Sequence, residues 1–212
     1  HKTVRRQRQM CIRDRYKDVY KKVIEDDEIT GNAKNFKLKF GSWVGADKDG
    51  NPFVTKNITK EALKIYSNQI LNIYKEQIVQ FSEEFSISTD FVESPKKLTK
   101  KIEEYKKILP NDYKHYKRVN FDEPFRIFLS LVFHRLDNFQ KNKKGYKYFY
   151  EFLDDISLFQ SSVLKIFGTK IQNTKLDNFI EMVYQFEFHG VCLDIRQNSS
   201  VINAQSGSCL LY

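Results

Sequence analysis

FGSWVGADKDGNPFVT, residues Phe40 to Thr55, cannot be an ordinary core-forming element. It holds the only tryptophan of the chain, together with three glycines, two aspartates, one proline and few aliphatic residues. Glycine allows backbone angles and close approaches that a side chain would block. Asp47, Asp49 and Asn51 add three short polar side chains within five residues. We therefore expect a loop that binds an ion or braces a polar site.

A strand is expected directly before this loop, because Phe36 to Phe40 alternates apolar and basic residues. Calcium is one candidate ligand, since Asp47 to Asn51 reads like the start of an EF-hand loop. That pattern fails at Pro52, where a glycine is needed for the sharp turn. It fails again at Ile58, where a bidentate glutamate is needed. We therefore predict no metal site in this loop.

The stretch resembles the signature loop of phosphoenolpyruvate carboxylase, GSWxGGDRDGNPxVT. It departs from that pattern at Ala46, where the family has glycine, and at Lys48, where the family has arginine. The downstream segment Leu193 to Ser199, LDIRQNS, resembles a second signature, LDIRQ(N/E)S. Two long motifs in the family's order, with a similar spacing, make coincidence improbable. The segment EPFRIFLSLVFHRL, residues 123 to 136, is similar to the family's EPYRxxLxxxxxRL helix, but far less specifically, and we interpret it as a core helix.

The resemblance implies a fragment from the N-terminal half of a longer subunit. The family fold is a TIM-like α/β barrel with many covering helices, so we expect a mainly α fragment with a few short strands. The implied reaction joins bicarbonate to phosphoenolpyruvate and yields oxaloacetate and phosphate, with Mg²⁺ or Mn²⁺ as cofactor. The implied setting is a cytoplasmic homotetramer, and nothing in these residues addresses its allosteric regulators.

Two substrate-binding residues follow from the motif positions. Arg196 matches the arginine that is implied to hold the substrate phosphate, and a guanidinium offers a planar fork of donors for two phosphate oxygens. Trp43 matches the tryptophan implied to line the apolar pocket around the substrate's methylene carbon, where excluding water protects the enolate. The open alternatives are an ion pair of Arg196 with Asp194, and a plain core position for Trp43.

Other motif residues are expected to support the site rather than to react. Lys48 keeps the charge of the family arginine but loses its bidentate geometry. The expected support residues are Asp47, Lys48, Asp49, Asn51 and Gln197. No catalytic residue is expected, because the family's catalytic histidine motif TAHPT, its catalytic lysine and its metal-binding carboxylates have no match here. His115, His134 and His189 lack the spacing of metal ligands. The fragment alone is therefore expected to be inactive.

The charge of the chain is concentrated at its start. Of the net charge of +9, residues 1 to 15 carry +5, from six basic residues and Asp14. We interpret residues 1–15 as a non-native or disordered basic tail and residues 206–212 as a non-native tail, because both ends resemble translated sequencing-adapter read-through. Residues 16–205 would form the partial carboxylase domain. The alternative is a basic helical module that binds nucleic acid, but only the charge favours it, so we expect no nucleic-acid partner.

No membrane span is expected, because the longest apolar stretch, Phe125 to Phe133, is short and contains Arg126. Cys11 and Cys209 lie in the two tails, so Cys192 has no disulfide partner, which fits a reducing compartment.

Residues 110–122 are expected to be a connection, and the second strand is expected at Val191 to Leu193. Apolar periodicity, caps and breakers predict helices over Tyr16–Glu28, Lys60–Phe85 with Thr59 as N-cap, Pro95–Leu109 with Ser94 as N-cap, Asp122–Phe139, Tyr146–Phe167 and Leu176–Phe188.

Overall fold

The computed structural model describes residues 39–168 and 174–201. The predicted helix Tyr16–Glu28, the strand residues before Lys39 and both predicted tails lie outside the described residues. The chain divides into two compact units, His1–Phe40 and Gly41–Tyr212, and the description below concerns the second.

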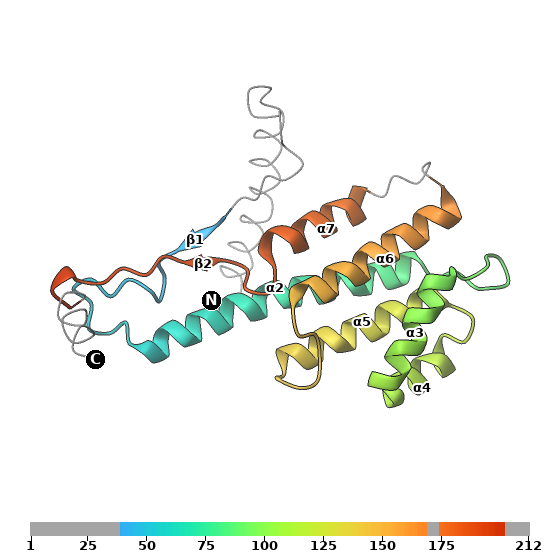
Figure 1. Cartoon of the computed structure of the whole chain (residues 1–212), viewed down its shortest axis with the longest axis horizontal. Coiled ribbons are helices and arrows are strands. Elements are labelled where there is room, and N and C mark those ends of the chain that lie inside the picture. The colour runs from blue at the N-terminus through green and yellow to red at the C-terminus, as the bar shows by residue number, and fades with distance from the viewer. Residues whose placement is uncertain (1–38, 169–173, 202–212) are drawn as a thin grey trace, which may run out of the picture. The chain divides into compact units, whose positions relative to one another are not determined.

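The second unit is mainly helical, as predicted, with short strands at either end of its described part (Figure 1). The strands β1 and β2 cover Gly41–Ser42 and Cys192–Leu193 and pair in parallel, so the predicted order of strand, helices and strand is confirmed. Between them lie α2 (Lys56–Glu84), α3 (Lys96–Ile108), α4 (Pro110–Val119), α5 (Pro124–Gln140), α6 (Phe149–Phe167) and α7 (Thr174–Phe186).

The long helix α2 carries the core along its length. Its buried side chains recur at helical spacing and face α5 and α7, and they are Ile70, Leu71, Tyr74, Ile78 and Phe81. Tyr66 and Ile73, which the periodicity placed on the same stripe, are only half-buried. The predicted N-cap Thr59 is wrong, because Thr55 caps the helix by accepting a hydrogen bond from the Ile58 amide at 3.4 Å. The loop therefore runs directly into α2.

A helix occupies most of the segment predicted to be a connection. Pro110 ends α3, as expected, but its fixed φ also suits the first turn of a helix, and α4 begins there. No side chain of α4 is fully buried, so the segment shows no apolar period. It packs instead through half-buried residues, including Tyr116, whose hydroxyl lies 2.8 Å from His134 Nε2 on α5. Similarly, Pro95 rather than Ser94 is the N-cap residue of α3.

The burial of α5 confirms the interpretation of this segment as a core helix. Eight of its residues are buried, including Phe125, Phe128, Leu129, Val132 and Leu136 of the predicted stripe. Arg135 is buried with them, and its guanidinium lies between helices rather than at the surface. Gly168 follows the last residue of α6 with φ 70°, a backbone conformation that favours glycine.

Arg135 belongs to a buried polar network that joins three helices. It donates to the Tyr105 hydroxyl of α3 at 2.8 Å and to Glu151 of α6 at 2.8 Å. The carboxylate of Asp155, also on α6, is fully buried and accepts hydrogen bonds from Tyr105 and from Tyr146, the latter at 2.5 Å. Burial raises the pKa of Asp155 despite these bonds and the nearby cations.

Candidate functional site

The two signature stretches lie side by side in parallel register. Gly41 pairs with Cys192, Ser42 pairs with Leu193, and a further bridge joins Asp47 to Arg196. Among the described residues, β1 is formed by Gly41 and Ser42 of the loop motif itself, and Lys39 and Phe40 of the predicted strand are not part of it. Chain segments about 150 residues apart in sequence therefore meet at their motifs.

A bulge separates the strand pair from the last bridge. Four residues, Trp43 to Ala46, lie on the first segment where the second has two, Asp194 and Ile195. Hydrogen bonds from the amides of Ala46 and Asp47 to the Trp43 carbonyl, at 2.9 and 3.1 Å, close this turn. Gly45 adopts φ 82°, and a Cβ there would lie 2.6 Å from that of Ala62 on α2. The turn is therefore packed on the first part of α2.

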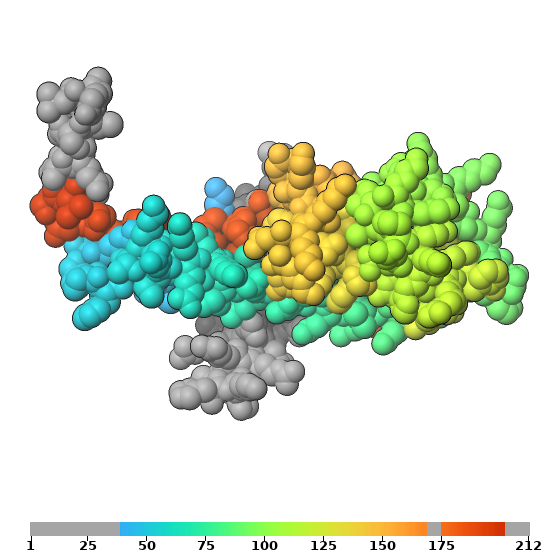
Figure 2. Space-filling model, turned by 90° about the horizontal axis from the view of Figure 1, so that it is seen from below, coloured from blue at the N-terminus to red at the C-terminus, as the bar shows by residue number. Residues whose placement is uncertain are grey.

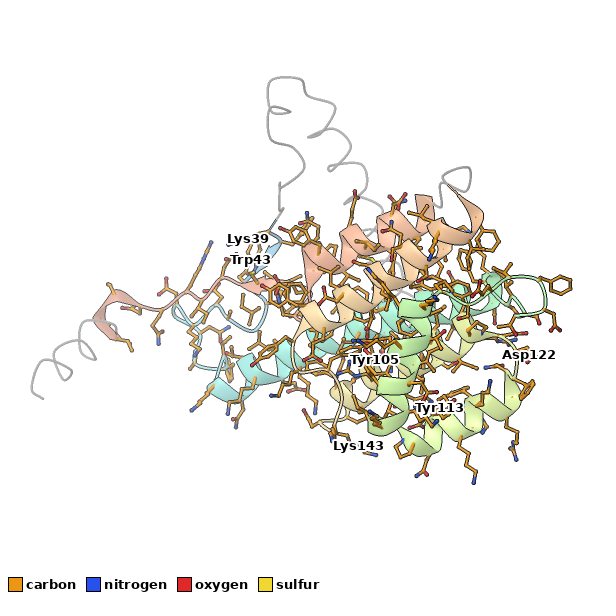
Figure 3. All side chains as sticks on the ribbon, turned by 45° about the vertical axis from the view of Figure 1, so that its right-hand side comes forward. Lys39, Trp43, Tyr105, Tyr113, Asp122 and Lys143 are labelled. Atoms are coloured by element: carbon orange, nitrogen blue, oxygen red, sulfur yellow. The ribbon has the colours of Figure 1, made fainter. Side chains whose placement is uncertain are left out.

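The bulge places Trp43 against Arg196. The guanidinium carbon lies 5.9 Å from the centre of the indole ring, within the range of a cation–π contact. Backbone bonds hold the pair in register: the Arg196 amide donates to Ala46 at 3.2 Å, and the Arg196 carbonyl accepts from Lys48 at 2.9 Å. Figure 3 shows Trp43 beside β1, apart from Tyr105 in the helical core.

Neither alternative for these two residues fits the structure. Trp43 is 60% exposed, so it is not a core residue of this part of the chain. Among the ion pairs of residues 39–168 and 174–201, none joins Arg196 to Asp194. The Asp194 carboxylate instead covers Gly41, where a Cβ would collide with it. Arg196 is also exposed, which leaves its donors accessible to an anion.

The expected support residues have different positions. Asp47 is half-buried and pairs through its backbone with Arg196, and the Lys48 amide makes the next bond in that ladder. Asn51 accepts a hydrogen bond from the Phe53 amide at 3.1 Å and so braces the loop after the site. Asp49 is exposed, and Gln197 accepts from the Asn198 amide at 3.3 Å.

Two hydrogen bonds between α2 and the site were not predicted from the sequence. The Tyr66 hydroxyl lies 2.9 Å from Ser42 Oγ, and the Ser67 hydroxyl donates to the Phe188 carbonyl at 2.7 Å. The apolar period assigned Tyr66 to the core, and nothing in that period distinguishes a tyrosine that only packs from one whose hydroxyl also forms a hydrogen bond. Figure 2 shows the blue loop and the start of α2 against the red segment after β2, with the green helices α3 and α4 at the far end of α2.

The donor set suits an anion rather than a metal ion. In the described part of the chain no three histidine, cysteine, aspartate or glutamate side chains form a possible metal site. An exposed guanidinium stacked on an indole offers instead a fixed charge, a fork of donors and an adjoining apolar face. The fold and site thus define a mainly helical segment built around a parallel strand pair, with an exposed guanidinium beside an indole ring.

Comparisons with known proteins give the family. The family model described as phosphoenolpyruvate carboxylase matches residues 12–206. Phosphoenolpyruvate carboxylases of Nostoc sp. and Xanthomonas oryzae are 32% and 31% identical to this chain over 182 and 165 residues, which cover 79% and 77% of it. That of Thermosynechococcus vestitus is 29% identical over 181 residues. The chain belongs to the phosphoenolpyruvate carboxylase family.

The match covers a small part of each relative. The aligned region is 17% of the Nostoc protein and 18% of the Xanthomonas protein. The activity of a whole carboxylase is therefore a proposal for this chain. Within the described residues, no helix is long and apolar enough to cross a membrane.

Proposed function

We propose that this chain is the part of a phosphoenolpyruvate carboxylase that supplies the Arg196 and Trp43 side of the substrate site. The complete enzyme would join bicarbonate to phosphoenolpyruvate and release oxaloacetate and phosphate, fixing carbon dioxide in the cytoplasm. The contact between Arg196 and Trp43, made by two motifs about 150 residues apart, is the observation that carries this proposal.

Arg196 would bind the phosphate group of the substrate. Its guanidinium stays protonated at any working pH and offers paired N–H donors to two phosphate oxygens. Its exposure leaves these donors free to meet a ligand, while the backbone bonds to Ala46 and Lys48 fix the base of the side chain. Preorganised cations of this kind stabilise negative charge as it develops during reaction.

Trp43 would form an apolar wall beside that phosphate. The ring already stacks near the guanidinium, so the substrate's methylene carbon could lie against the indole while its phosphate meets Arg196. Exclusion of water at this carbon protects an enolate from simple protonation. Asp47, Lys48, Asp49, Asn51 and Gln197 would keep the loop and the strand end in place.

The remaining parts of the active centre would come from elsewhere in a longer subunit. The described residues do not make a ligand group for Mg²⁺ or Mn²⁺, so no step of the chemistry is assigned to a metal here. We propose that β1 and β2 are neighbouring strands of a larger α/β barrel, since parallel strands are found buried on both faces. Exposed Val44 and Ile195 beside the strands support this. The intact enzyme would be a homotetramer, and this chain alone would be inactive.

Grafting the two motifs into a complete relative tests the assignment. Residues 41–55 and 193–199 of this chain would replace the matching segments of the Nostoc carboxylase, and oxaloacetate formation would be measured. We expect an active graft, in which Arg196→Met lowers kcat/KM for phosphoenolpyruvate by about 100-fold, because a charged hydrogen-bond pair is worth up to about 3 kcal/mol.

The control in the same loop is Phe53→Ala, because Phe53 is 84% exposed and lies outside the contact. It should leave kcat/KM of the graft within about twofold, as expected of a surface substitution. An inactive graft, or equal activity of the Arg196→Met and unaltered grafts, would overturn the proposed role.

A further inference from the structure

Two consecutive side chains of α2 hold the two halves of the site. Tyr66 reaches the loop, with its hydroxyl 2.9 Å from Ser42 Oγ, immediately before Trp43. Ser67 reaches the approach to β2, where its hydroxyl donates to the Phe188 carbonyl at 2.7 Å. Both side chains are half-buried, and both lie outside the two signature stretches. One turn of one helix is thus bonded to segments more than 140 residues apart.

The bond from Tyr66 fixes the start of the bulge. Ser42 Oγ also accepts a hydrogen bond from the Val44 amide at 3.3 Å, so the orientation of this hydroxyl affects the backbone on both sides of Trp43. The loop has few apolar anchors of its own, since Trp43 and Val44 are exposed and only Ala46 is fully buried. A polar bond to a rigid helix therefore has a large influence on where the indole lies.

The second segment is pressed onto the same part of α2. Gly190 adopts φ 77°, and a Cβ there would lie 3.2 Å from the Tyr66 carbonyl. Tyr74, two turns further along α2, donates from its hydroxyl to the Glu187 carbonyl at 2.8 Å. The turn before β2 is consequently tied to α2 by Ser67 and Tyr74, which both follow Tyr66 in the helix.

We propose that Tyr66 and Ser67 are positioning residues that set the register in which Trp43 meets Arg196. Neither side chain touches either of these two residues; they act through Ser42 and through the backbone at Phe188. The inference rests on the proposed function for the identity of the ligand, but the geometry that it concerns exists without any ligand.

The single tryptophan makes a direct test possible. The ¹⁵N–¹H spectrum of the 212-residue chain has one indole cross-peak, which reports on Trp43 alone. Arg196→Met gives the position of this peak without the guanidinium. We expect Tyr66→Phe, Ser42→Ala and Ser67→Ala each to move it toward that position. Loss of one hydrogen bond should change the equilibrium between two conformations of the loop, one held on α2 and one released from it, about fivefold.

Tyr116→Phe is the matched control. Its hydroxyl is also half-buried and also bonded to a side chain, His134, but it lies on α4 and has no contact with the site. This variant should leave the indole peak unmoved. Circular dichroism verifies that each variant keeps its helices. Ser42→Ala leaves α2 unchanged and removes the bond to Tyr66 together with the bond from the Val44 amide.

The inference is overturned if the indole peak stays in place in folded Ser42→Ala and Ser67→Ala. It is also overturned if Tyr116→Phe moves the peak as far as they do. These spectra are recorded without phosphoenolpyruvate, so they can fail while the graft remains active. Conversely, an inactive graft would leave the positioning result unaffected.

Discussion

At the scale of single residues, the site depends on a glycine, whose lack of a side chain allows close packing, as much as on the residues that bind. Gly45 shows this most clearly, because its positive φ and its contact with Ala62 let the bulge lie flat on α2. Trp43 and Arg196 could be paired from the sequence, since each lies in a long motif of one family. Tyr66 could not, because a tyrosine at helical spacing looks the same whether it packs or donates a hydrogen bond.

Gly45→Ala should destabilise the loop and displace Trp43. The new methyl group would meet the Ala62 Cβ at 2.6 Å, in addition to the backbone strain of about 1–2 kcal/mol for a non-glycine residue at positive φ. Urea unfolding and the indole cross-peak measure the two effects. Gly50→Ala is the control, because Gly50 also has positive φ but no atom lies within 4 Å of its Cβ position. If Gly50→Ala and Gly45→Ala lowered the free energy of unfolding equally, the packing of Gly45 on α2 would contribute nothing to stability.

Lys48→Arg should improve the grafted enzyme. The Lys48 amide donates to the Arg196 carbonyl, and the Lys48 side chain carries a charge but lacks the planar fork of the family residue. We expect kcat/KM for phosphoenolpyruvate to rise about tenfold, the equivalent of one charged hydrogen bond of about 1.4 kcal/mol. Steady-state kinetics of the two grafts give the ratio. A ratio of one or below would mean that position 48 does not face the substrate.

At the scale of elements, apolar periodicity located helices with a buried stripe and missed the helix without one. The stripes of α2, α3 and α5 follow the sequence prediction apart from half-buried members such as Tyr66 and Ile73. By contrast, α4 packs through half-buried residues and was expected to be a connection. The start of α2 was misplaced because Thr55 and Thr59 are equally good caps in the sequence, and only the structure shows which hydroxyl meets a free amide. The network around Arg135 was also invisible, because its members come from three helices.

Removal of Arg135 should destabilise the chain in a pH-dependent way. Arg135→Met leaves the buried Asp155 carboxylate without its guanidinium neighbour, which should cost about 3–5 kcal/mol at pH 7. Burial raises the folded-state pKa of Asp155 above its ordinary value of 3.8, and the substitution raises it further. Lowering the pH toward this raised pKa increases the protonated fraction of the carboxyl, so the cost should be smaller at pH 5 than at pH 7.

Urea unfolding at the two pH values measures this effect. Arg135→Lys keeps a positive charge and should lose less stability than Arg135→Met at pH 7. The same loss for Arg135→Met at both pH values would contradict the role given to the charge of Asp155.

At the scale of the whole molecule, we propose that the chain supplies one side of a site whose other parts belong to a longer subunit. The family and the helical content were predictable because long motifs and strong periodicity specify them. The barrel was a consequence of the resemblance alone, since a pair of two-residue strands does not define one.

The isolated chain should show no carboxylase activity. In an assay coupled to malate dehydrogenase, NADH oxidation with phosphoenolpyruvate and bicarbonate should equal the rate without the chain, while the Nostoc enzyme serves as positive control. Binding of phosphoenolpyruvate should be weaker than about 1 mM, since one exposed cation and one ring offer little beyond about 4 kcal/mol. Turnover above background would contradict this prediction.

Titration of phosphoenolpyruvate against the Trp43 indole cross-peak tests the central claim most directly. We predict a shift at millimolar concentrations that is lost in Arg196→Met and is absent when pyruvate, which has no phosphate, replaces the substrate. An equal shift in Arg196→Met, or no shift in the unaltered chain, would contradict the assignment of Arg196 and Trp43 to the substrate site.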